Sequence, residues 1–105
     1  MVLAFWLHAG APRVHAEALT RQAGIESGFR PCVENSMGHF LYGWVATRRQ
    51  ALARFAGTAG CPSLQAQLRS AQHELEQPPY SAFWAVPPAR ALAVLRRCYG
   101  KGRCR

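Results

Sequence analysis

The residues of this chain that are best suited to catalysis cluster around a single glutamate. Glu26 is flanked by Ile25 and Phe29 and precedes Gly28, so we expect its carboxyl at the end of a helix and partly removed from water. Removal from water disfavours the charged form of a carboxyl and raises its pKa, as a general acid near neutral pH requires. Glu26 is therefore the candidate proton donor.

Composition limits the kind of protein that carries this residue. The 105 residues are 50% hydrophobic and 17% charged, which is typical of a folding chain, and we expect one small domain spanning 1–105. Thirteen Lys and Arg against five acids give a net charge of +8, which predicts an anionic partner such as nucleic acid, anionic lipid or bacterial cell wall. No apolar run approaches the roughly 18 residues of a membrane span.

Helical periodicity, interrupted by Gly and Pro, predicts a mainly α fold of about five or six short helices. The predicted helical and aromatic segments are 2–9, 14–25, 47–55, 63–75, 80–86 and a last helix that opens at 87–88 and runs through 99. Leu52 and Phe55 should form the inward face of the third segment. Residues 28–41 are rich in Gly, Pro, Asn and Ser and predict an irregular loop or a small hairpin after the Glu26 helix.

Four cysteines in a small basic chain predict two disulfides and an oxidising compartment. Of the three pairings that four cysteines allow, we predict Cys32 with Cys61 and Cys98 with Cys104, the second closing a short glycine-containing loop. Two alternatives are four reduced buried thiols and a zinc site. Zinc is disfavoured because there is no C-x-x-C pair and the histidines lie far apart, so we expect no metal and no cofactor.

The ordered residues from 26 to 75 resemble the phage tail lysozyme family of the lysozyme-like superfamily. The matching segments are E-S-G-F-R-P at 26–31, an Asn at 35, L-Y-G-W at 41–44, R-R-x-x-L at 48–52 and Q-A-Q-L with a later E-L at 65–75. The likeness extends over nearly all of the chain. Phe40 stands where the family usually has Gly, which would narrow a cleft. Gly43 stands where it usually has Gln, which removes a polar contact with substrate.

The resemblance implies a lysozyme-like fold and an enzyme that cleaves peptidoglycan between N-acetylmuramic acid and N-acetylglucosamine, as a lysozyme or a lytic transglycosylase. Glu26 would be the general acid. Among the other acids of the chain, Glu34 is placed best by sequence to be a second carboxylate, because it lies in the loop after the Glu26 helix. If Glu34 is too distant, Glu26 alone would act as acid and then base, closing a 1,6-anhydro ring. The implied substrate-binding residues are Ser27, Asn35, Tyr42, Trp44 and Tyr80.

The expected partner is the glycan strand of peptidoglycan, bound by a monomer at a periplasmic or extracellular site. Residues 1–11 lack the basic start and the long apolar stretch of a signal peptide. Two other functions stay open. One is a wall-binding domain with impaired catalysis, which the Gly43 substitution favours. The other is a basic nucleic-acid-binding module, for which the net charge is the only evidence. Because the arginines are spread over several helices, we expect no nucleic acid partner.

The aromatic and basic residues after the hairpin also have plainer interpretations. Tyr42 and Trp44 are alternatively ordinary core aromatics, since large aromatic side chains dominate protein cores. Arg48 and Arg49 are alternatively a solvated helix face.

Overall fold

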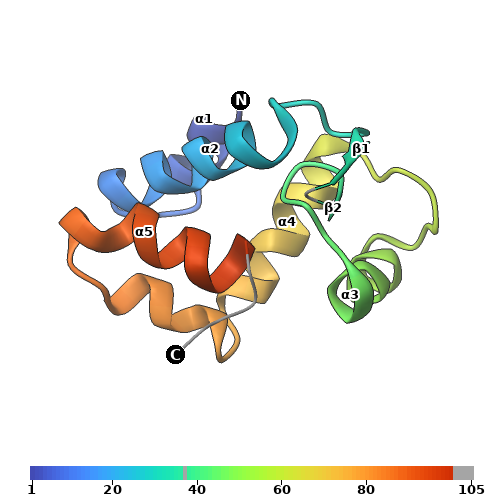
Figure 1. The fold of residues 1–105 in the computed structure, drawn as a ribbon. Coiled ribbons are helices and arrows are strands. Elements are labelled where there is room, and N and C mark those ends of the chain that lie inside the picture. The colour runs from blue at the N-terminus through green and yellow to red at the C-terminus, as the bar shows by residue number, and fades with distance from the viewer. Residues whose placement is uncertain (37, 101–105) are drawn as a thin grey trace. The chain divides into compact units, whose positions relative to one another are not determined.

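Helices make up most of the chain in the computed structural model, which describes residues 1–36 and 38–100 (Figure 1). The elements in chain order are α1 (Val2–His8), α2 (Arg13–Ser27), β1 (Glu34–Asn35), β2 (Gly38–His39), α3 (Ala46–Ala56), α4 (Leu64–Leu75), the 3-10 helices η1 (Tyr80–Ala85) and η2 (Pro88–Arg90), α5 (Ala91–Leu95) and the π-helical turn η3 (Arg96–Gly100). The predicted mainly helical fold, with a small hairpin after the helix that carries Glu26, is confirmed. Across these described residues, no helix combines the length and the apolar character needed to cross a membrane.

Two compact units share the chain. One contains residues 1–22 together with the segment from Glu74 onward, and the other is Ala23–His73. The boundaries lie within two helices, α2 and α4. Glu26, the hairpin, α3 and most of α4 therefore belong to the second unit.

The first unit is built on aromatic packing, and side-chain hydrogen bonds of Trp84 and Tyr99 support it. Its buried residues include Trp6, Leu19, Phe83, Leu95 and Tyr99. The indole of Trp84 donates to the carbonyl of Leu75 at 2.8 Å, and the hydroxyl of Tyr99 donates to Glu74 at 2.6 Å. These bonds satisfy the polar ends of large side chains that otherwise bury apolar surface.

His15 occupies the interior of the same unit. Its ring packs edge-on against Phe83, with centroids 5.0 Å apart, and stacks on Trp84 at 5.9 Å. Within the described residues, neither ring nitrogen has a hydrogen-bond partner. A polar ring in this position opposes folding, since buried polar groups are normally paired.

Helix α4, most of which belongs to the second unit, presents an apolar stripe at helical spacing. Leu68, Ala71 and Leu75 are buried, and the hydroxyl of Ser63 accepts the backbone N–H of Ala66 at 3.1 Å, which caps the start of the helix.

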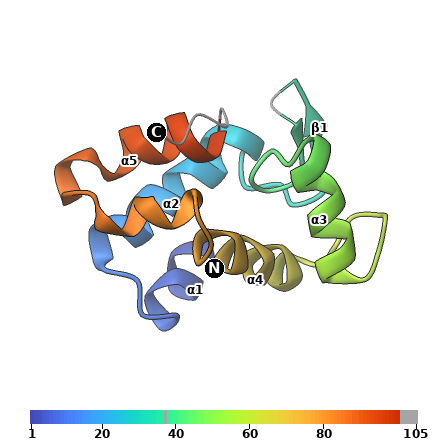
Figure 2. The same cartoon turned by 90° about the horizontal axis from the view of Figure 1, so that it is seen from below.

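Helix α3 departs from its predicted inward face. Leu52 is buried, but Phe55 is 48% exposed and its ring stacks on His73 with centroids 5.3 Å apart. The two residues lie three positions apart, so their side chains point about 60° away from each other around the helix. Phe55 therefore lies at the margin of the buried face, whose centre is Leu52. Gly57 then ends the helix in the left-handed conformation, with φ of 73°. Figure 2 shows the long connection from α3 to α4 that follows.

The hairpin pairs Glu34 with His39 and Asn35 with Gly38 in antiparallel register. Gly38 has φ of 127°, and a Cβ added there would lie 2.5 Å from the backbone oxygen of Gly43. Because that neighbour is backbone, no side chain fits at position 38 without moving the turn.

The end of α2 reverses the chain sharply. Gly28 and Phe29 both have φ of 62°, and for Phe29 this is a strained conformation. The reversal lays the Phe29 ring on Gly24, where a Cβ would come within 2.9 Å of the ring. A helix residue without a side chain thus makes room for the aromatic ring of the motif that follows Glu26.

Candidate functional site

Glu26 lies in the last turn of α2 and is 3% exposed. The carbonyl end of a helix disfavours a negative charge, and burial disfavours it further. Buried titratable groups cluster at functional sites, so the Glu26 carboxyl is a candidate for a functional role.

Ser27 and Asn35 lie close to Glu26 in the same unit. The amide of Asn35 donates from Nδ2 to the backbone oxygen of Glu26 at 3.1 Å, which fastens the hairpin to the end of α2. Ser27 is buried, and its hydroxyl donates to the carbonyl of Ala23 at 2.8 Å. The structure thus brings these three predicted site residues together.

Glu34 is directed elsewhere. Its carboxylate is exposed and contacts Nδ1 of His39, its partner across the hairpin. Successive residues of a strand point to opposite faces, so Glu34 and Asn35 face different sides of β1. Asn35 takes the side of Glu26. The role of Glu34 as a second carboxylate stays a prediction.

Tyr42 and Trp44 are both 0% exposed, and their rings meet edge to face with centroids 5.9 Å apart. A ring with no exposed surface presents no face to a sugar, so in this conformation the pair supports the hairpin from inside. Their contact with glycan stays a prediction. Tyr80, the remaining predicted binding residue, belongs to the other unit, where its ring meets Tyr99 edge to face at 5.7 Å. Its contact with glycan is likewise a prediction.

Arginines from α3 cover the aromatic residues of this unit. The guanidinium of Arg48 lies 5.8 Å from the centroid of the Trp44 ring, and that of Arg49 lies 4.7 Å from that of Phe40. Both arginines are half-buried, so they differ from a fully solvated helix face. Phe40 is itself buried, so its ring packs within the unit.

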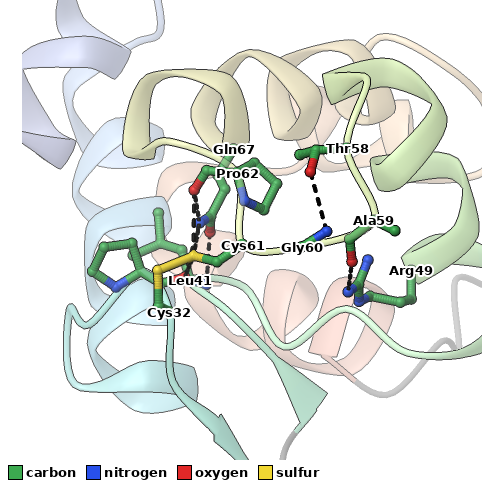
Figure 3. The surroundings of a disulfide bond; sticks show 10 residues. Cys32, Leu41, Arg49, Thr58, Ala59, Gly60, Cys61, Pro62 and Gln67 are labelled. Atoms are coloured by element: carbon green, nitrogen blue, oxygen red, sulfur yellow. Dashed lines mark hydrogen bonds between the residues drawn. A yellow bond between two sulfur atoms is a disulfide. The ribbon is translucent and has the colours of Figure 1, made fainter.

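A disulfide holds the loops on either side of the hairpin and α3. The predicted bond between Cys32 and Cys61 is present, with Cα atoms 5.5 Å apart (Figure 3). The other predicted pair joins Cys98 to Cys104, and Cys104 lies outside the described residues.

Gln67 belongs to the Q-A-Q-L segment noted in the sequence, but its structural role was not predicted. Its side chain is fully buried beside the disulfide, where Oε1 accepts the N–H of Leu41 at 2.9 Å. Its Nε2 donates to the carbonyls of Pro31 at 2.8 Å and Pro62 at 3.0 Å. The available signal was its place directly before Leu68, at the edge of the apolar stripe of α4.

Comparison of the sequence with known protein families, with curated proteins and with solved structures gives no significant match. A functional conclusion therefore depends on the residues themselves. The best-defined chemical feature among them is the buried carboxyl of Glu26 with the hairpin fastened beside it.

Proposed function

We propose that this protein cleaves the glycan strand of peptidoglycan at the β-1,4 bond between N-acetylmuramic acid and N-acetylglucosamine, with Glu26 as the general acid. The observation that carries the proposal is the burial of Glu26 at the carbonyl end of α2, where Asn35 joins the hairpin to its backbone. Because Glu26 is 3% exposed, its carboxyl reaches a glycosidic oxygen only when the residues over it move. The likeness of residues 26–31 to the phage tail lysozyme signature supports the same reaction. Such an enzyme is an antibacterial protein of the endolysin, tail lysozyme or secreted effector kind.

The proposed chemistry begins with proton transfer. Glu26 gives its proton to the glycosidic oxygen as the bond from that oxygen to C1 of N-acetylmuramic acid breaks, leaving an oxocarbenium-like sugar. The Glu26 carboxylate then takes the proton of the muramyl 6-hydroxyl while the 6-oxygen bonds to C1. This closes a 1,6-anhydro ring, restores the acid and consumes no water.

The position of Glu34 favours this one-carboxylate route over hydrolysis. Its carboxylate is exposed and engaged with His39, on the side of β1 that Asn35 does not take. Inverting hydrolysis needs a second carboxylate to activate water, and retaining hydrolysis needs one to attack the sugar. In the anhydro route Glu26 performs both proton transfers.

Charge and oxidation state fit a partner in the cell wall. A net charge of +8 suits a polymer that carries stem-peptide carboxylates and associated phosphates. The bond between Cys32 and Cys61 is consistent with an oxidising site outside the cytoplasm.

The test is cleavage of purified peptidoglycan by wild type, Glu26→Gln and Glu17→Gln, with the released fragments identified by mass spectrometry. Glu17 is the matched control, since it lies on the same helix but is exposed and paired with Arg13 at 3.4 Å. We expect Glu26→Gln to lose at least about 100-fold in rate, the usual contribution of a general acid, and Glu17→Gln to stay near wild type. Cleavage by a folded Glu26→Gln at the wild-type rate would reject the mechanism.

The fragments also separate the two routes. Anhydro-muramyl ends, with near wild-type cleavage by Glu34→Gln, are expected for the one-carboxylate route. Reducing muramyl ends, with loss of cleavage in Glu34→Gln, would instead assign hydrolysis by two carboxylates.

A further inference from the structure

The loops on either side of the hairpin and α3 are joined twice at nearly the same place. The covalent connection is the bond between Cys32 and Cys61. The second is Gln67, which binds the carbonyls of Pro31 and Pro62, the chain neighbours of the two cysteines (Figure 3). One side chain therefore duplicates the connection that the disulfide makes.

The two connections differ in their access to solvent. Both cysteines are exposed, whereas Gln67 is fully buried. A small thiol in solution can approach the sulfur atoms, and disulfide exchange depends on such access. Water cannot readily compete for the amide of Gln67.

We propose that the Cys32–Cys61 bond is a reversible outer clamp that small thiols such as glutathione open, and that Gln67 is an inner clamp that keeps the same loops together in the reduced protein. A thiolate attacks one sulfur, the S–S bond breaks, and the other cysteine leaves as thiolate. A second thiol resolves the mixed disulfide. The two cysteines gain two electrons and two protons, and the two thiols become their own disulfide.

The segment that the disulfide encloses carries part of the candidate site. The bond has a sequence separation of 29 residues, and the enclosed segment 33–60 includes Glu34, Asn35 and Trp44. Closing a ring of this size restricts the opened chain far more than the folded one, so the bond chiefly suppresses opening. Reduction leaves the fold in place but lets residues 33–60 open more often. The consequence for catalysis rests on the proposed function, whereas the clamp itself does not.

The test is hydrogen exchange, followed by mass spectrometry, of the wild-type protein in oxidised and reduced glutathione. A variant with both Cys32→Ser and Cys61→Ser isolates this bond from any other cysteine. We expect reduction, or the double serine variant, to accelerate exchange within 33–60 roughly 100-fold or more, from the loop-closure entropy of a ring of this size. Far-UV circular dichroism should stay unchanged.

Gln67→Leu tests the inner clamp, with Gln65→Leu on the exposed face of the same helix as its control. With the disulfide intact, Gln67→Leu should stay folded. Combined with the serine substitutions, it should exchange throughout 33–60 at the rate of an unstructured chain, while Gln65→Leu in that background behaves like the serine variant alone. The joint effect should exceed the two separate effects combined, since each clamp masks the loss of the other.

Three results would overturn the proposal. The first is equal exchange in the two redox states, and the second is a bond that glutathione reduces only in denaturant. The third is a double serine variant that is unfolded, since the disulfide would then be an obligatory staple without an inner clamp. If exchange responds as expected but no redox form cleaves peptidoglycan, the proposed function fails and the clamp stands.

Discussion

Replacing His15 with leucine should stabilise this protein. The His15 side chain is buried, at 4% exposure, and within the described residues neither of its nitrogens has a hydrogen-bond partner. Leucine has a similar volume, so it should fill the space beside Phe83 and Trp84 without leaving a large cavity. The substitution removes two polar atoms from an apolar surrounding.

The size of the effect follows from two opposing terms. A neutral imidazole carries one donor and one acceptor, and each costs about 1 to 3 kcal/mol when buried without a partner. Against this gain of about 2 to 6 kcal/mol stands the loss of two ring contacts, each contributing about 0.5 to 1.5 kcal/mol. Taking the midpoints of the two ranges, the free energy of unfolding should rise by about 2 kcal/mol. The melting temperature should rise by several degrees, since each kcal/mol shifts it by about 4 to 8 °C in a small domain.

The assay is urea unfolding at neutral pH, supported by scanning calorimetry. His8→Leu is the matched control, because His8 is exposed and its replacement should change the unfolding free energy by less than about 0.5 kcal/mol. His15→Phe separates the two terms, since it removes the nitrogens but keeps an aromatic ring. An unfolding free energy for His15→Leu that is equal to or below wild type, at unchanged urea dependence, would refute the reasoning. It would mean that the ring nitrogens are hydrogen-bonded in solution.

Two further substitutions should destabilise the second unit, both measured by urea unfolding. Gly38→Ala places a Cβ 2.5 Å from the backbone oxygen of Gly43 and should lower the free energy of unfolding by at least about 3 kcal/mol. Gly60→Ala is the control, because a Cβ there meets only ordinary contacts. Equal stability of the two variants would contradict the turn geometry. Gln67→Leu leaves three backbone groups without their partner and should cost about 3 to 5 kcal/mol, against little for Gln65→Leu. A loss below about 1 kcal/mol in Gln67→Leu would show that water replaces the amide readily.

The helices were predictable because their determinants are local. The stripe through Leu68, Ala71 and Leu75 and the cap at Ser63 depend on residues within one or two turns of one another. The bond between Cys32 and Cys61 belongs to one of the three pairings that four cysteines allow, and the sequence alone does not exclude the other two.

The interior of the second unit was not predictable in the same way. Whether an aromatic ring such as Tyr42 lines a surface or fills a core depends on what packs over it, and its hydrophobicity is the same in both cases. The network of Gln67 joins Pro31, Leu41 and Pro62, which are up to 36 residues from it in sequence. No local sequence pattern predicts these contacts, because they form only when the fold brings the loops together.

The Phe29 ring resting on Gly24 has a consequence for the sequence history of this protein. A side chain at 24 would push the exposed Phe29 ring aside, so a change at position 24 alters the placement of the residue at 29. Relatives that carry alanine or a larger residue at 24 are expected to have a smaller or differently directed residue at 29, and those that keep the aromatic ring are expected to keep the glycine. The pair would then appear in an alignment as correlated positions five residues apart, and its absence from diverged relatives would mark chains in which the turn after Glu26 is built differently.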